Sequence, residues 1–155
     1  MRFLIPILFL TALTGSRVEA RLGETQAEIE KRYGPPIRKL KFQKPIEKKL
    51  KYHFGGYVIE VSFIQDRCVI EAVDRDDRGF FGEDEIAALL RANEAGLSWQ
   101  REESSNTERE YRRTDGKAVA RLNAYLTRLT LASADSATPS EKVEGKPVRK
   151  ALEGF

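Results

Sequence analysis

The stretch KYHFGGYVIEVSFIQDRCVIEAV, residues 51–73, decides the fold, because apolar and polar residues alternate through its middle. Such alternation is typical of a β-strand with one buried face. The apolar face of the expected strand carries Tyr57, Ile59, Val61 and Phe63. Glu60 and Ser62 point to the opposite face.

Two turn signals divide this stretch into strands. Gly55-Gly56 is a two-residue hairpin signal, and a second turn falls near Gln65 to Arg67. A further apolar run follows over residues 68–73. The sequence therefore predicts three antiparallel strands.

A short helix precedes these strands, within RLGETQAEIEKRYGPP at residues 21–36. Thr25 and Glu28 have the spacing of a capping box at the helix start. Gly34 suits the position after the last turn, and Pro35 cannot continue a helix. Because acidic residues already occupy the positive end of this helix, we interpret it as scaffold rather than as an anion site.

The second half repeats the order of helix and strands. A helix is expected over Glu83 to Asn93, ending before Gly96. Its apolar face carries Ile86, Leu89, Leu90 and Asn93. Asp115-Gly116 is a hairpin turn between EREYRR and KAVARLNAY, and LTRLTLA (126–132) supplies the last strand.

We expect an α+β domain with an antiparallel sheet and two short helices on one face. The domain spans residues 21–132 and can be divided into two weakly similar helix-plus-meander units, about 22–73 and 82–131. Gly23-Glu24 opens the first unit and Gly82-Glu83 the second. Residues 133–155 lack apolar periodicity, which predicts a disordered tail that the fold does not need.

The first 20 residues, MRFLIPILFLTALTGSRVEA, have the pattern of a secretory signal peptide. Arg2 precedes a short apolar run, and Val18-Glu19-Ala20 forms a cleavage site. The run is too short for a spanning helix, which needs about 20 apolar residues. We therefore predict a periplasmic or secreted protein with no transmembrane segment in its mature chain. Since no cysteine lies at the cleavage point, it is not expected to be a lipoprotein.

The composition of the chain bears on its partners, its disulfides and its cofactors. The chain has 27 basic and 24 acidic residues, and without Arg2, Arg17 and Glu19 the balance is 25 to 23. This weak excess does not favour nucleic acid as a partner. Cys68 is the only cysteine, so no internal disulfide forms. No motif indicates a cofactor.

One segment, residues 38–51, is strongly basic. It contains Arg38, Lys39, Lys41, Lys44, Lys48, Lys49 and Lys51 against the single acid Glu47. These residues are candidates for a surface that holds an anionic partner. The alternative is a sheet edge protected by lysines. The interleaved apolar residues are expected to point inward: Leu40, Phe42, Ile46 and Leu50.

Two chemical alternatives remain open. His53 is the only histidine, and it forms a conceivable dyad with Cys68 in a small hydrolase, although a plain strand histidine is favoured. The loop Asp74–Glu85 matches a calcium loop at Asp74, Asp76, Gly79 and Glu85. Arg78 places a cation where that loop needs an oxygen ligand, which favours an acidic connector.

Trp99 is the only tryptophan and lies between the second helix and the strands that follow. A large aromatic residue at such a junction typically fills core space. We therefore expect Trp99 to be buried.

The start Gly23-Glu24-Thr25, the short helix and YGPP (33–36) before a hairpin resemble the small outer-membrane assembly lipoproteins of the BamE (SmpA/OmlA) type. The doubled unit is similar to the tandem architecture of beta-lactamase inhibitory protein. This chain departs from the first family in lacking the lipobox cysteine. The resemblance implies a noncatalytic module that binds a protein or an anionic envelope component, and it transfers no site residue.

We predict that export is accompanied by cleavage between Ala20 and Arg21, because small residues occupy the positions that signal peptidase reads. Intact-mass spectrometry of the exported protein should give a chain that begins at Arg21. A mass that includes residues 1–20 would contradict this prediction.

Overall fold

The computed structural model describes residues 21–102 and 108–136. The expected signal peptide and the part of the expected tail beyond residue 136 lie outside the described residues. The elements are α1 (Gln26–Tyr33), β1 (Arg38–Lys39), β2 (Lys48–Phe54), β3 (Tyr57–Ile64), β4 (Arg67–Arg75), α2 (Glu83–Arg91), β5 (Trp99–Glu102), β6 (Arg109–Arg113), β7 (Ala118–Leu122), β8 (Arg128–Ser133) and the 3₁₀ helix η1 (Ala134–Ser136).

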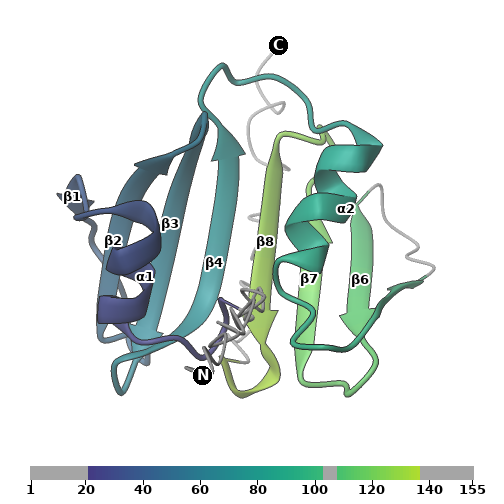
Figure 1. The fold of residues 1–155 in the computed structure, drawn as a ribbon. Coiled ribbons are helices and arrows are strands. Elements are labelled where there is room, and N and C mark those ends of the chain that lie inside the picture. The colour runs from purple at the N-terminus through teal and green to yellow at the C-terminus, as the bar shows by residue number, and fades with distance from the viewer. Residues whose placement is uncertain (1–20, 103–107, 137–155) are drawn as a thin grey trace, which may run out of the picture.

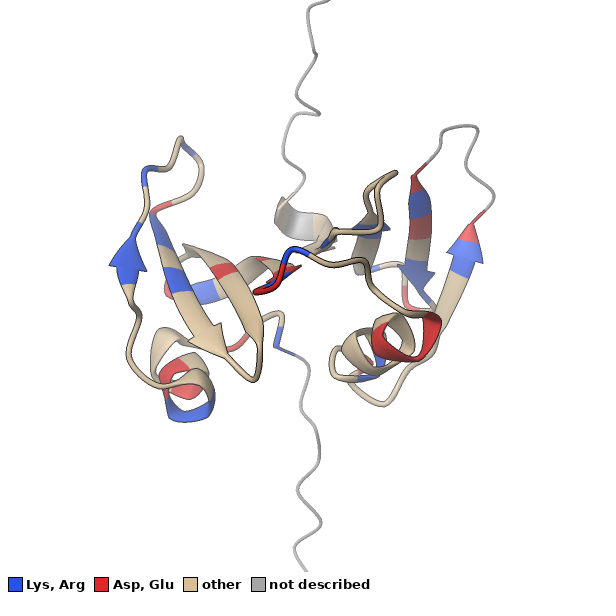
Figure 2. Ribbon diagram, turned by 90° about the horizontal axis from the view of Figure 1, so that it is seen from above, with Lys and Arg blue, Asp and Glu red and all other residues tan. Residues whose placement is uncertain are grey.

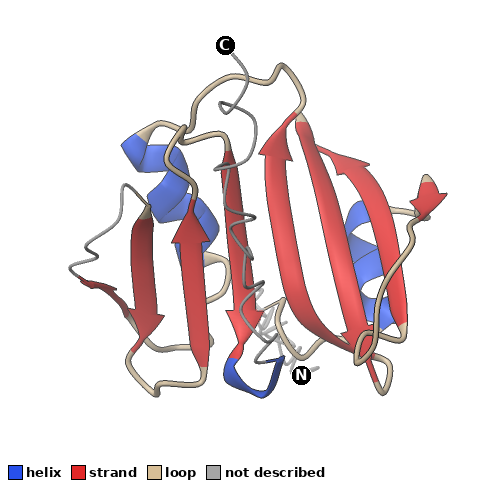
Figure 3. Ribbon diagram, turned by 180° about the vertical axis from the view of Figure 1, so that it is seen from behind, coloured by secondary structure: helices blue, strands red, loops and turns tan. Residues whose placement is uncertain are grey.

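The strands form one antiparallel sheet in the order β1-β2-β3-β4-β8-β7-β6-β5. Each half of the sheet is a meander, and the pairing of β4 with β8 joins the halves in the middle. Both helices cover the same face (Figure 1), and the opposite face carries no helix of the described residues other than η1 at its margin (Figure 3). The expected α+β class is confirmed, with the sheet as its dominant part.

Local signals in the sequence fix the first helix. The Thr25 hydroxyl accepts a hydrogen bond from the backbone N–H of Glu28, and the Glu28 carboxylate accepts one from the N–H of Thr25. Gly34 ends the helix with a positive φ of 81°, where a side chain would be strained. The predicted capping box and stop are therefore confirmed.

The hairpin predictions are also confirmed. Gly55 and Gly56 both have positive φ and join β2 to β3, and Gln65 and Asp66 do the same between β3 and β4. Gly116, also at positive φ, lies in the turn between β6 and β7. Two-residue turns with positive φ match the twist of the strands that they connect.

The core lies between the sheet and the helices. Alternate residues of the strands supply its sheet side, including Leu50, Tyr52, Val61, Phe63, Leu129 and Leu131. The helices contribute Ile29 and Tyr33 from α1 and Ile86, Leu89 and Leu90 from α2. Burial of one such side chain is worth about 1.5–3 kcal/mol, so this layer holds the helices on the sheet.

A buried carboxylate interrupts this apolar layer. Glu71, in the middle of β4, is fully buried and points to the helix side. It accepts a hydrogen bond from the Tyr33 hydroxyl at 2.6 Å, and Asn93 Nδ2 lies 3.4 Å from its other oxygen. Arg21 adds an ion pair at 3.3 Å. Glu71 thus connects both helical regions to the centre of the sheet.

The inward orientation expected for four apolar residues of the basic segment is correct only for Leu50. Phe42 is 50% exposed, and Leu40 and Ile46 are half-buried. For Phe42 and Ile46 the reason is that residues 41–46 lie between β1 and β2 outside the strands, so strand alternation does not apply to them. This loop stands on the side away from the helices (Figure 2).

Three boundaries need correction. The helix α2 ends at Arg91 rather than Asn93, and Gly96 follows it in the next turn. The domain extends past residue 132, because Ser133 belongs to β8 and Ser136 is buried. The residues that cap the starts of α1 and α2 are Thr25 and Gly82. Gly82 therefore corresponds to Thr25, and the expected match of Gly82-Glu83 with Gly23-Glu24 is shifted by two residues.

Trp99 is half-buried at the edge of the core rather than enclosed by it. Its indole N–H donates a hydrogen bond to the Leu90 carbonyl at 2.9 Å. It therefore bridges α2 and β5, as its position in the sequence suggests, but keeps one side exposed. None of the helices among the described residues is long and apolar enough to cross a membrane.

We predict that Glu71→Gln lowers the free energy of unfolding by about 3 kcal/mol, the scale on which breaking a buried ion pair destabilises a protein. The amide would present a donor where Tyr33, Asn93 and Arg21 all donate. Urea unfolding followed by circular dichroism measures the change.

The matched control is Glu110→Gln, because Glu110 pairs with the exposed side chains of Arg121 and Arg112. Loss of these surface pairs should cost about 1 kcal/mol or less. Equal unfolding midpoints for Glu71→Gln and the unchanged protein would show that the buried carboxylate does not hold the fold.

Candidate functional site

The face of the sheet away from the helices is the candidate site, and we call it the open face. Residues paired across antiparallel strands point to the same side. One row of pairs therefore runs through Lys49, Ser62, Ile70 and Ala132. The neighbouring row runs through Lys51, Glu60, Ala72 and Thr130.

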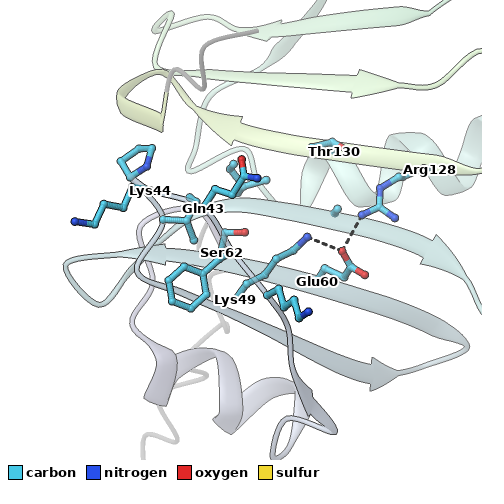
Figure 4. Close-up of a pocket in the computed structure, with 13 residues that line it drawn as sticks. Gln43, Lys44, Lys49, Glu60, Ser62, Arg128 and Thr130 are labelled. Atoms are coloured by element: carbon cyan, nitrogen blue, oxygen red, sulfur yellow. Dashed lines mark hydrogen bonds and ion pairs between the residues drawn. The ribbon is translucent and has the colours of Figure 1, made fainter. Parts of the chain in front are cut away.

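A pocket of about 880 Å³ lies on the open face over β2, β3, β4 and β8. Its floor contains Ser62, Ile70, Ala72 and Thr130. The loop of residues 41–46 forms one wall (Figure 4). The pocket therefore exists because the loop leaves the sheet on the side opposite to the helices.

Glu60 organises the charges beside this floor. Its carboxylate lies 3.0 Å from Lys49 Nζ, 3.5 Å from Lys51 Nζ and 3.0 Å from the Arg128 guanidinium. Lys49 and Arg128 approach it from different strands (Figure 4). Burial opposes the ionised form, but the hydrogen bond from Lys49 and the charges of Lys49 and Arg128 outweigh it, so the pKa of Glu60 lies below its ordinary value.

Arg128 also binds a second carboxylate, that of Asp74, at 2.7 Å. Burial is the largest effect on Asp74 and exceeds the opposing effect of Arg128, so the pKa of this carboxyl lies above its ordinary value. Arg128 therefore spans two acids from the neighbouring strands and fixes the geometry of this edge of the pocket.

The structure divides the seven predicted basic residues into two groups. Lys48 contacts Gln26 and Asp66, while Lys49 and Lys51 contact Glu60. The other members of the set make no ion pair within the described residues: Arg38, Lys39, Lys41 and Lys44. Of these, only Lys41 and Lys44 line the pocket.

The alternative dyad of His53 and Cys68 does not form, and His53 is a strand residue as the favoured interpretation has it. In the strand register His53 is opposite Val58, whereas Cys68 is opposite Phe63 at the other end of β3. His53 is a surface residue that pairs with Asp76 at 2.8 Å. Cys68 is buried, and burial raises the pKa of its thiol well above its ordinary value, which suppresses the reactive thiolate.

The geometry of Asp74–Glu85 favours the acidic connector over the calcium alternative. The carboxylates of the proposed ligands are held by separate basic side chains instead of facing a common centre: Asp74 by Arg128, Asp76 by His53 and Glu85 by Arg75. Glu85 also accepts a hydrogen bond from the Tyr57 hydroxyl and caps α2 at Gly82. Within residues 21–102 and 108–136, no three potential ligand side chains gather at one point.

Sequence reasoning missed Arg128 and Thr130 as parts of the site. The alternation in LTRLTLA separates them from Leu129 and Leu131, so their orientation could have been predicted. Their position could not, because it depends on the pairing of β8 with β4 across more than 50 residues of chain. Glu60 and Ser62 were predicted to point to this side, which is correct.

No protein-family model matches the chain, and no curated protein shows significant similarity to it. A cysteine-rich secretory protein from Staphylococcus aureus subsp. aureus Mu50 has a solved structure that resembles it, with a TM-score of 0.44 and 9% sequence identity. The similarity covers 74% of this chain and 44% of that one.

We predict that Glu60→Gln makes the stability of the fold depend less on pH in the acid range. The folded pKa of Glu60 lies below the ordinary value of 4.5, so its contribution to stability is complete above that pH and is lost as the pH falls through the lowered pKa. Thermal unfolding midpoints of the two proteins should therefore differ at neutral pH and converge in acid.

Asp66→Asn is a suitable control, because Asp66 is an exposed turn residue with a single long contact to Lys48. A constant difference between Glu60→Gln and the unchanged protein at every pH would contradict an ionised Glu60 that stabilises the site.

Proposed function

We propose that the chain is an exported, noncatalytic binding module that holds its partner on the open face of the sheet. The observation that carries the proposal is the pocket of about 880 Å³ on that face. The helix side of the sheet is occupied by the core, whereas the open side presents polar and charged side chains around a hollow. The predicted signal peptide supports export.

The second half of the open face supports a protein as partner. There the charges occur as pairs of opposite sign: Arg112 with Glu102 at 2.6 Å, and Arg121 with Glu110 at 2.9 Å. A surface of mixed sign suits another protein surface, which can offer complementary charges of both signs. Paired charges at an interface contribute specificity and correct registration more than raw affinity.

We also propose that the domain is a tandem of two helix-plus-meander units, as in the architectures that the sequence resembles. Two observations support this: a helix followed by four strands occurs twice, and β4 and β8, the last strand of each unit, are adjacent. An internal duplication would place the units about an axis between these strands, and the open face would extend across both.

Photo-crosslinking at Phe42 tests the binding function. Phe42 lines the pocket and is half exposed, so benzoylphenylalanine can replace it with little disturbance. Expressed with its own leader in its native organism, this variant should give a discrete crosslinked product. The captured protein should bind the purified domain, and Thr130→Trp, which fills the floor, should weaken that binding.

The same replacement at Phe80 is the matched control, because Phe80 is an exposed phenylalanine that does not line the pocket. A discrete product from position 80 alone, or from neither position, would reject the open face as the binding surface. Binding that Thr130→Trp leaves unchanged would reject it as well.

A further inference from the structure

We infer that the pocket receives an acidic side chain from a segment of the partner protein that also carries apolar residues. This inference rests on the proposed function and names the chemistry of the partner at that site. It follows from the charge balance of the pocket, its apolar lining and the shape of the surface around it.

The pocket has an excess of positive charge that its own residues do not neutralise. Its lining contains four cationic residues and one acid: Lys41, Lys44, Lys49 and Arg128 against Glu60. Glu60 already contacts Lys49, Lys51 and Arg128. Lys41 and Lys44 therefore lack an anionic partner among the described residues, and a carboxylate entering the pocket would provide one.

The lining of the pocket also contains apolar residues. Phe42 and Pro45 belong to the same loop as the two lysines, and Ile70 and Ala72 belong to the floor. An isolated anion would use only the charged part of this lining. A peptide segment that alternates acidic and apolar side chains would use both, and the Ser62 and Thr130 hydroxyls could bond its polar groups.

A segment of protein suits this site better than an anionic membrane. The floor of the pocket lies on the sheet, beside a loop that stands away from the helices (Figure 2). A planar lipid surface would contact the loop and leave the floor unused. In the second half of the open face Glu102 and Glu110 are already paired with Arg112 and Arg121, so these residues offer anionic headgroups no excess of positive charge.

Binding of short labelled peptides to the mature chain tests this inference. The probe alternates Glu and Val over about six residues, the length of a typical strand, and its matched version carries Gln in place of Glu. Fluorescence anisotropy at low ionic strength should show the Glu peptide binding at least about tenfold more tightly than the Gln peptide. Salt should weaken the difference, because the lysines are exposed.

Two double variants separate the pocket from general basic charge. Lys41→Glu with Lys44→Glu should weaken binding of the Glu peptide by about tenfold or more. Arg38→Glu with Lys39→Glu makes the same change in net charge on the neighbouring edge strand, outside the pocket, and should change binding by less than about twofold. Equal losses for both variants would show a diffuse basic surface and overturn the inference.

Two further probes address other anions. Vesicles of phosphatidylglycerol and phosphatidylcholine, and heparin, should bind no more tightly than the Glu peptide and should not distinguish the two double variants. Preference for vesicles or heparin with dependence on Lys41 and Lys44 would reassign the pocket to lipid or glycan. If crosslinking at Phe42 succeeds while the Glu peptide fails to bind, the binding function stands and the acidic-segment inference falls.

Discussion

The buried carboxylate of Glu71 is the constraint on which the arrangement of this domain depends. It lies on the central strand β4 and receives contacts from Tyr33 of α1 and Asn93 just beyond α2. A charge buried in an apolar layer is costly unless donors surround it, so these groups must converge on one point. Both helical regions are thereby drawn to the same face of the sheet, with Arg21 completing the set.

Because the helices cover one face of the sheet, the pattern of each strand determines which side chains the open face presents. Most apolar residues of the strands face the helices, so the far side presents charged and polar residues together with a few apolar ones such as Ile70 and Ala72. Most charges there are neutralised by partners on adjacent strands, as Glu60 is by Lys49 and Arg128. Such cross-strand pairs stabilise the sheet and restrict the positions of their side chains. The loop of residues 41–46 then turns a flat surface into a pocket.

The parts of this fold that sequence could predict are those determined by neighbouring residues. The Thr25–Glu28 capping box and the turn at Gly55-Gly56 depend on contacts within a few residues, and both were predicted correctly. The position of Arg128 beside Glu60 depends on β8 pairing with β4, which no local pattern specifies. Phe42 was misassigned for a related reason: its side chain was oriented from strand alternation, but its backbone has left the sheet.

In the basic segment, the position of each lysine in the fold determines whether it pairs within the sheet or is available to bind a partner. On β2, Lys49 and Lys51 lie opposite Ser62 and Glu60, and both form ion pairs with Glu60 inside the sheet. On the loop, which belongs to no strand, Lys41 and Lys44 make no ion pair with the part of the chain that the structure describes. Sequence presents these lysines as one run of positive charge, but only the unpaired ones retain the capacity to bind something else. Beside Phe42 they form a small surface that is both cationic and apolar, a combination that solubility alone does not require.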